Sequence, residues 1–399
     1  DPEIIVSEKL DELVNFRKTN ESMPEFWGKQ FDLGLAWVQF PEGSGGLGIN
    51  PKYQLMVTNR LRDEGISQNN RIANILGVGM GAPTIVEYGT PEQIQKYLRP
   101  MFTADEIWCQ LFSEPGSGSD LASLSTRAID DGDGYIVNGQ KVWNTMAHLG
   151  DWGMLVTRTD PDMPKHRGMT YFAVDMKSPG VDVQPLRQIT GEAEFNEVFL
   201  TDVQIPDSDR IGDVGDGWRV SLTTLMNERN AIGVGSGGGP PKAGSGPVAI
   251  LTKMWRDTPE DLRKSVDLDR IMDLYVRSET QRLTNIRAGQ NRRKGNPGPE
   301  MSIAKLAFAE LNQDILTAAV DLMGMAGQIN YDYTFRRPED LSVDGSESGV
   351  QHGFLRVRAN SIEGGTSEIM RNILGEQVLG LPGEPRIDKD VPWIEVPRS

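Results

Sequence analysis

The sequence predicts an α+β protein of several domains, in which a helical region, a β-rich region and a second helical region follow one another. Three observations support this prediction. At 399 residues the chain is too long for one simple core, so two or three domains are expected. Apolar residues recur at three- and four-residue intervals in the first hundred residues and again after Gly217, as in helices. Between these regions lie short apolar runs separated by turn residues, which is typical of an antiparallel barrel or sandwich.

The first helical region covers residues 1–105. Apolar spacing predicts helices over 5–16, 52–62 and 68–85. A further helix is expected to begin at Thr90-Pro91, because threonine caps a helix start and proline fits the first turn. These segments together make an N-terminal helical domain.

The middle β-domain covers residues 106–212. The run Asp130-Asp131-Gly132-Asp133-Gly134 separates two strand-like segments and predicts a hairpin. Further strand-like runs follow in the sequence, over 152–159, 169–176, 181–186 and 197–205.

The second helical region covers residues 213–380. Long helical patterns occupy 268–293 and 302–323, and a last helix is expected from about 366 to 379. The remaining segment, 381–399, contains four prolines and is predicted to be an extended tail.

Composition excludes several classes of function. The net charge of −16 argues against nucleic-acid binding, which requires a basic surface. No apolar run reaches the roughly 18 residues that a membrane span needs. Cys109 is the only cysteine, so no intrachain disulfide can form and a cytoplasmic protein is expected. The three histidines have no metal-ligand spacing, so no catalytic metal is expected.

The segment Leu225-Met226-Asn227-Glu228-Arg229 places a carboxylate beside an arginine on an apolar helix. Arg229 stands four residues after Leu225 on the apolar stripe, where a lone buried charge would be costly. One interpretation is an ion pair on the helix surface. The other is a partly desolvated general base, because desolvation raises the pKa of a carboxylate toward neutrality.

Three other segments carry a weaker signal. The loop Ser113–Asp120 is rich in small residues, which allow close approach to a ligand but also suit an ordinary turn. Trp143 and Thr145 could stack on and bond to a flat aromatic cofactor, although the pattern alone favours a structural tryptophan. Near the C-terminus, Gly364-Gly365-Thr366 indicates a helix start that favours anionic or electron-rich groups.

Taken in order, these segments resemble the acyl-CoA dehydrogenase family of flavoenzymes, and the resemblance covers most of the chain. It implies an N-terminal helical domain, a middle β-domain and a C-terminal four-helix bundle. Similar enzymes bind FAD and remove two hydrogens across the α,β bond of an acyl-CoA. In them a glutamate takes the α-proton, and the β-hydrogen leaves as hydride to the flavin.

By position, the resemblance implies a site for each part of the cofactor. The isoalloxazine ring is expected at Gln110, Phe112, Ser113, Trp143 and Thr145. Gly118 and Ser119 are expected near the flavin, with Ser119 also near the thioester. Arg229 would lie on the substrate side, and Thr366 and Glu368 near the flavin diphosphate.

The catalytic base departs from the family's usual pattern. Many members carry the base just before the Gly-Thr of the C-terminal motif, where this chain has Gly364, which cannot take a proton. A minority carry it on the helix after the β-domain, immediately before an arginine. That position is Glu228, which we expect to be the base. Gly364 would contribute its N–H to the thioester carbonyl.

The half of the site that related homotetramers donate to a neighbouring subunit also departs from the pattern. A Gln-x-x-Gly-Gly segment reads Asp321-Leu322-Met323-Gly324-Met325 here. Asp321 would repel a diphosphate and Met325 would crowd it. Because some actinobacterial relatives form α2β2 heterotetramers, we expect a hetero-oligomer with a related subunit, with a homotetramer as the alternative.

Two other functions remain open from the sequence. One is a flavin oxidase or monooxygenase on the same fold, and the other is a non-catalytic partner subunit of a heteromeric dehydrogenase. The retained Glu228, Ser113 and Trp143 argue against the latter. The resemblance also implies an electron-transfer flavoprotein as the electron acceptor.

Overall fold

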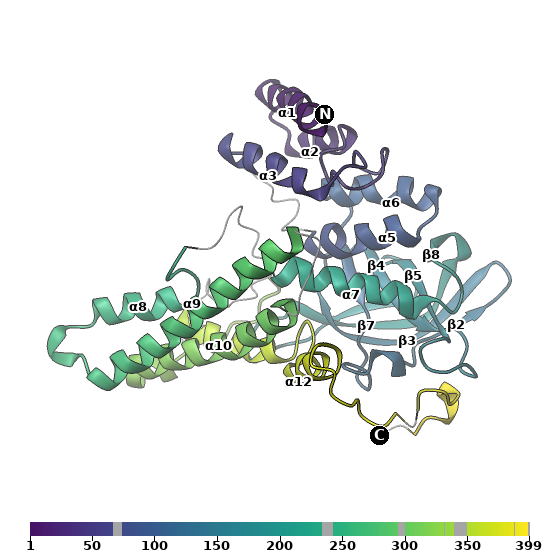
Figure 1. The fold of residues 1–399 in the computed structure, drawn as a ribbon. Coiled ribbons are helices and arrows are strands. Elements are labelled where there is room, and N and C mark those ends of the chain that lie inside the picture. Colours follow the sequence, from purple (N-terminus) through teal and green to yellow (C-terminus); the bar gives the residue numbers. More distant parts are fainter. Residues whose placement is uncertain are drawn as a thin grey trace.

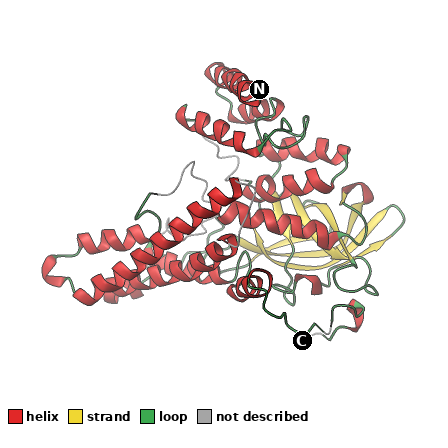
Figure 2. Cartoon of the chain, in the orientation of Figure 1, coloured by secondary structure: helices red, strands yellow, loops and turns green. Residues whose placement is uncertain are grey.

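A computed structural model describes residues 1–66, 74–233, 242–293, 300–330, 332–338, 349–386 and 388–397, without the side chains of 229–233, 292–293 and 300–302. It shows the predicted order of a helical domain, a β-domain and a second helical domain (Figure 1). In Figure 2 the strands form one body, and α7, a helix that follows it in the chain, lies across it. Within the described ranges, no helix combines the length and the apolar character needed to cross a membrane.

The N-terminal domain is built from short helices that pack around aliphatic and aromatic residues. Thr90 begins the last of them with a capping box, since its hydroxyl accepts from Gln93 N–H while the Gln93 side chain accepts from Thr90 N–H. The predicted helix over 68–85 lies partly outside the described residues. The helices are α1 (Pro2–Thr19), α2 (Met23–Asp32), α3 (Gln54–Asp63), α5 (Ala82–Tyr88) and α6 (Pro91–Thr103), with a π-helical stretch at Gly77–Gly81 before α5.

The middle domain is an eight-stranded sheet in the order β6-β7-β3-β2-β4-β5-β8, with β1 added beside β4. The predicted hairpin is confirmed, because β2 and β3 pair antiparallel around the Asp130–Gly134 turn. β4 pairs in parallel with β1 and β2, so the sheet is mixed rather than wholly antiparallel. The strands are β1 (Trp108–Leu111), β2 (Arg127–Asp130), β3 (Gly134–Thr145), β4 (Trp152–Arg158), β5 (Met169–Asp175), β6 (Val181–Pro185), β7 (Phe195–Pro206) and β8 (Arg210–Ile211).

The C-terminal domain begins with a helix that packs on the sheet. Gly217 starts this helix, and a β-carbon there would lie 2.7 Å from the Thr170 backbone, so glycine allows the close approach to β5. The next three helices form an arm around an aliphatic core, on the left in Figure 1. The helices are α7 (Gly217–Gly233), α8 (Val248–Asp257), α9 (Ser265–Arg293), α10 (Glu300–Met323), α11 (Val350–Arg356) and α12 (Ser367–Asn372), with a π-helical stretch at Ile373–Val378 after α12.

One aromatic-rich core is shared by the N-terminal domain, the sheet and α7. Tyr97 of α6 packs edge-on against Trp108 of β1, and Trp108 stacks on Trp152 of β4. Val220 of α7 is completely buried in the same cluster. The relative placement of α7 and the sheet is therefore fixed by packing rather than by linkers.

The tail after Gly380 returns to the middle domain. Trp393 is buried there, its indole N–H pointing at the Ser123 carbonyl and the Arg158 guanidinium lying over its ring. Lys165 joins Asp388 of the tail to Asp120 of the small-residue loop, at 2.6 and 2.9 Å. The predicted extended tail is thus largely without regular structure, but it is anchored.

Candidate active site

Glu228 and Gly364 come from distant parts of the chain and lie next to each other. Glu228 is half-buried near the end of α7, and Gly364 stands in the turn before α12. A β-carbon added to Gly364 would lie 3.8 Å from Oε1 of Glu228. Gly364 and Gly365 have φ values of +63° and +99°, in the left-handed region that favours glycine. The structure therefore places the proposed base against the glycine turn.

The position of Glu228 is fixed one helical turn earlier, at Thr224. The hydroxyl of Thr224 lies 2.9 Å from that of Thr84 on α5 and 3.3 Å from the hydroxyl of Tyr171 on β5. Thr224 is completely buried. Because α7 is bonded to both neighbours at this level, the carboxylate of Glu228 stands at a defined height above the sheet.

Lys305 on α10 also contacts the glycine turn, and its Cε lies 3.8 Å from the same β-carbon position of Gly364. Its ammonium donates to the carbonyl oxygens of Asn360, at 2.8 Å, and of Gly365. Burial lowers the pKa of Lys305, and attraction by Glu363, Glu228 and Glu368 acts against that shift. The lysine therefore supplies a positive charge next to the proposed base.

The residues expected at the flavin ring on β1 are joined to those at the end of β3. The Asn144 side chain donates to the Gln110 carbonyl at 2.8 Å, and the Val142 N–H donates to the Ser113 carbonyl at 2.9 Å. The ring of Phe112 is buried edge-on against Tyr171. Any contact of Phe112 with a ligand would therefore be through its main chain.

A buried ion pair holds these two segments together. Lys141 is fully buried and donates to Glu114 at 2.9 Å and to the Phe112 carbonyl at 3.0 Å. Burial alone would raise the pKa of Glu114, but the charge of Lys141 and hydrogen bonds from Thr126 and Ser125 lower it to about 2. Burial lowers the pKa of Lys141, and Glu114 opposes that shift. Because four donors converge on the carboxylate, we regard the pair as ionised at neutral pH.

Trp143 is exposed in a way that the rest of β3 is not. Its side chain is 59% exposed, and its φ of +61° is unusual for a bulky residue. Thr145, two residues on, is half-buried. Gly118 and Ser119 are exposed, and a β-carbon on Gly118 would meet nothing within 4 Å. The structure therefore leaves an exposed aromatic ring at Trp143 and an open loop at Gly118 and Ser119.

Thr366 and Glu368 begin α12. The hydroxyl of Thr366 accepts from the Ile369 N–H at 3.1 Å and so caps the helix. Glu368 is exposed in the first turn, where its charge suits the helix dipole. Ser367 between them is buried, and no hydrogen-bond partner for its hydroxyl is found in the described part of the chain. The carboxylate of Glu368 could accept hydrogen bonds from hydroxyl groups of a cofactor but not from its phosphates.

Glu363, which precedes Gly364, is part of a buried charge cluster. The Arg356 guanidinium donates two hydrogen bonds to its carboxylate, at 3.1 and 3.0 Å, and the Asn360 side chain donates a third at 2.6 Å. Nε of Arg356 also lies 3.0 Å from Oε1 of Glu194, without the alignment of a hydrogen bond. Burial raises the pKa of Glu194 to about 7, with Arg356 opposing and Glu363 adding to the rise.

Several residues that the sequence singled out make none of these contacts, or have side chains outside the described residues. The side chain of Arg229 lies outside the described residues. Asp321 pairs with Arg270 at 2.6 Å on the helical arm, and Met325 is 78% exposed. Among the described side chains, no group of three histidines, cysteines or carboxylates is placed to hold a metal ion.

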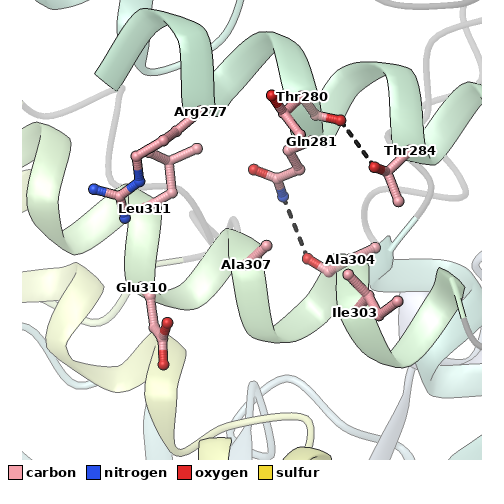
Figure 3. A pocket seen from close by; sticks show the side chains of 9 residues that line it. All are labelled: Arg277, Thr280, Gln281, Thr284, Ile303, Ala304, Ala307, Glu310 and Leu311. Carbon is pink, nitrogen blue, oxygen red and sulfur yellow. Dashed lines mark hydrogen bonds between the residues drawn. The ribbon is translucent and has the colours of Figure 1, made fainter. Parts of the chain in front are cut away.

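A cavity of about 270 Å³ lies between α9 and α10, and neither Glu228 nor Gly364 lines it. Figure 3 shows Gln281 of α9 donating to the Ala304 carbonyl of α10 at its centre. The cavity is open and largely apolar, and it lies on the helical arm. We therefore do not assign the chemistry to this cavity. Its lining residues are Arg277, Thr280, Gln281, Thr284, Ile303, Ala304, Ala307, Glu310 and Leu311.

Sequence reasoning missed the charged residues that support the site. Lys141 stands two residues before Trp143 in a segment that was singled out, and a lysine inside a strand-like run was the available signal. Lys305 and Arg356 carry no such local signal. Their roles depend on helix crossings that bring distant segments together.

Comparison with known proteins agrees with the fold. Residues 5–105, 109–203 and 215–379 match the N-terminal, middle and C-terminal domains of acyl-CoA dehydrogenase, respectively. The chain is 33% identical over 362 residues to acyl-CoA dehydrogenase IpdE1 of Mycobacterium tuberculosis, covering 88% of this chain and 86% of the relative. It is 36% identical over 352 residues to acyl-CoA dehydrogenase FadE34 of the same organism, covering 88% of this chain. That match spans only 45% of FadE34.

A solved structure gives the same result. The ChsE4–ChsE5 complex from Mycobacterium tuberculosis superposes with a TM-score of 0.68 at 25% identity, covering 95% of this chain and 98% of the compared chain. The arrangement of domains thus defines a class of oxidoreductases that is typically FAD-bound. The chain belongs to the acyl-CoA dehydrogenase family.

Proposed function

We propose that the protein catalyses the FAD-dependent α,β-dehydrogenation of an acyl-CoA to the trans-2-enoyl-CoA. The observation that carries this proposal is the 3.8 Å approach of Glu228 Oε1 to the β-carbon position of Gly364. In this arrangement the carboxylate of Glu228 takes the α-proton of the substrate. The Gly364 N–H donates a hydrogen bond to the thioester carbonyl oxygen. Bound FAD would supply the acceptor for the hydride that leaves the β-carbon.

The residues present fit an isoalloxazine ring. Trp143 offers an exposed aromatic face, and the main chain of Gln110 to Ser113 runs beside it. The open space at Gly118 leaves room for further parts of the cofactor. The buried hydroxyl of Ser367, which has no partner among the described residues, could donate a hydrogen bond to them. We assign the ring to Gln110, Phe112, Ser113, Trp143 and Thr145, with the phosphate-bearing part near Thr366.

We also propose that the complete site is shared with a related but different subunit. Asp321 and Met325 stand where a neighbouring chain's cofactor would be held in a homotetramer, and both are exposed. Asp321 pairs with Arg270 at 2.6 Å, so it offers a diphosphate no free donor, and the side chain of Met325 would crowd one. A heteromeric complex, ChsE4–ChsE5, is among the similar structures. By the same resemblance, an electron-transfer flavoprotein would be the physiological acceptor.

The first experiment is the FAD content of the chain purified alone, from its visible spectrum against protein concentration. We expect little flavin, restored by co-expression with a related partner. About one FAD per chain from the isolated subunit would rule out the shared site. The flavin-loaded protein is then mixed anaerobically with linear, branched and steroid side-chain acyl-CoAs. Bleaching supports a dehydrogenase, whereas flavin that stays oxidised with every thioester would overturn the proposed reaction in favour of an oxidase or monooxygenase that does not use CoA.

A further inference from the structure

The cluster of Glu194, Arg356 and Glu363 connects the glycine turn to the middle domain. Arg356 is 4% exposed, and its fork is matched to the two carboxylate oxygens of Glu363. Glu194, immediately before β7, is 2% exposed. Burying an arginine and two carboxylates carries a large desolvation cost, which their mutual attraction often fails to exceed. The Arg356–Glu363 pair is therefore better explained by the position that it gives the glycine turn than by a gain in stability alone.

The same arginine faces the aromatic side of the site. Its guanidinium lies over the ring of Phe195, 5.8 Å from the centroid. Phe195 in turn packs edge-on against Trp143, with ring centroids 5.8 Å apart. A continuous line of contacts thus runs from Trp143 through Phe195 and Arg356 to Glu363, the residue before Gly364.

The turn is therefore held at both of its ends by cations. Arg356 fixes the Glu363 end through the side chain, and Lys305 fixes the Gly365 end through the carbonyl. Asn360 ties the two together, because its side chain donates to Glu363 and its carbonyl accepts from Lys305. Gly364 lies between these anchors with no side chain of its own to hold it.

We propose that Arg356 is a positioning residue: by gripping Glu363 it sets the Gly364 turn at the distance from Glu228 that proton abstraction requires. This inference rests on the proposed function. It goes beyond it in naming a residue that would act through its contact with Glu363. Misplacing reacting groups by about 1 Å can slow a reaction roughly 100-fold, so a loosened turn has a large expected effect.

The test compares Arg356→Lys, which keeps the charge and loses the fork, with Glu363→Gln, which keeps the shape and loses the charge. The matched control is Arg371→Lys, whose arginine pairs with Glu310 on the surface. The flavin-loaded complex is mixed anaerobically with the acyl-CoA that best bleaches the wild type, and the rate is expressed per bound flavin at saturation. We expect a fall of about 10- to 100-fold in both cluster variants and less than 2-fold in the control.

Amide hydrogen exchange of the peptide containing Glu363 to Gly365 provides a readout that needs no substrate. We expect at least 10-fold faster exchange of this peptide in Arg356→Lys, with the peptides of α10 unchanged. Unchanged exchange at the turn would overturn the inference whatever the substrate is. A wild-type rate per bound flavin in both variants would also overturn it, while leaving the proposed reaction intact. If no thioester bleaches the wild type, the proposed reaction fails and the exchange measurement alone decides the role of Arg356. Should Arg356→Lys not fold, Glu363→Gln, at a partly exposed side chain, carries both measurements.

Discussion

Oε1 of Glu228 lies 3.8 Å from the point where a β-carbon on Gly364 would stand. Glu228 belongs to α7, and Gly364 belongs to the turn before α12. A carboxylate attached at either position would therefore be directed at much the same space. This relationship explains how a chain can carry its base on one segment while the other segment is reduced to glycine.

Replacing Glu228 with glutamine removes the proposed base without changing the shape of the side chain. We expect the rate of flavin reduction by acyl-CoA to fall by about 10²- to 10⁴-fold, because general base catalysis contributes on that scale. FAD content should stay at the wild-type level. The measurement is anaerobic stopped-flow absorbance. A Glu12→Gln variant, which alters a surface carboxylate paired with Lys29, serves as the control and should reduce at the normal rate. Full activity in Glu228→Gln would remove the assignment.

The geometry also predicts that the base can be moved. In the double variant Glu228→Gln/Gly364→Glu, we expect at least about 10-fold recovery over Glu228→Gln alone. Recovery should be incomplete, because a non-glycine residue at φ +63° is strained by about 1–2 kcal/mol. The control is Glu228→Gln/Gly364→Gln, which adds the bulk without the carboxylate. If the two double variants reduce flavin equally slowly, the two positions do not share one reaction site.

The buried Lys141–Glu114 pair should show strong energetic coupling. Removing one partner leaves an uncompensated buried charge, so Lys141→Met and Glu114→Gln should each destabilise the protein by about 3–5 kcal/mol. The double variant should lose much less than the sum of the two. Urea unfolding followed by tryptophan fluorescence measures the three values. Additive losses would show that the two side chains do not depend on each other.

The lowered pKa of Glu114 predicts that the folded protein loses stability in acid. The pKa of Glu114 is lowered from 4.5 to about 2 in the folded protein. A depressed pKa gives stability that is complete above the unfolded value and is lost as pH falls from about 4.5 to about 2, an effect of roughly 3 kcal/mol. Comparing unfolding at pH 6 and pH 3 in the wild type and in Glu114→Gln/Lys141→Met checks this. An equal loss in both proteins would contradict it.

The raised pKa of Glu194 predicts the opposite dependence of stability on pH. Its pKa is raised from 4.5 to about 7, so the folded protein holds a proton that the unfolded chain releases. Stability from this group is therefore complete below about pH 4.5 and falls as pH rises to about 7, by roughly 3 kcal/mol. Glu194→Gln should be more stable than the wild type at pH 8, and the difference should vanish near pH 4.5. A pH-independent difference would mean that Glu194 does not titrate in this range.

The order of the domains followed from apolar periodicity, and the hairpin around Asp130–Gly134 followed from its turn residues. The glycine turn at Gly364 was also predictable, because two adjacent glycines before a threonine leave few other conformations. These features are local, so the signal that encodes them is contained in a short stretch of sequence. The roles of Glu228 and of the flavin-ring residues remain proposals.

The supporting charges could not be predicted in the same way. Arg356 pairs with Glu194, and Lys305 reaches Gly365, only because the β-domain, α10 and α11 pack together. Nothing in the residues around Lys305 distinguishes it from an exposed helical lysine. The parallel pairing of β4 with β1 and β2 likewise depends on long connections whose path the strand pattern does not contain.

Tyr97, Trp108 and Trp152 belong to one aromatic cluster, although the first comes from the helical domain and the other two from the sheet. The N-terminal and middle regions match separate family domains, but they share one hydrophobic core, so we expect neither to fold alone. A fragment cut between Thr103 and Trp108 would expose half of an aromatic core on each piece. Heating should accordingly melt the N-terminal helices and the sheet in one cooperative transition, and neither half would serve as a transplantable module.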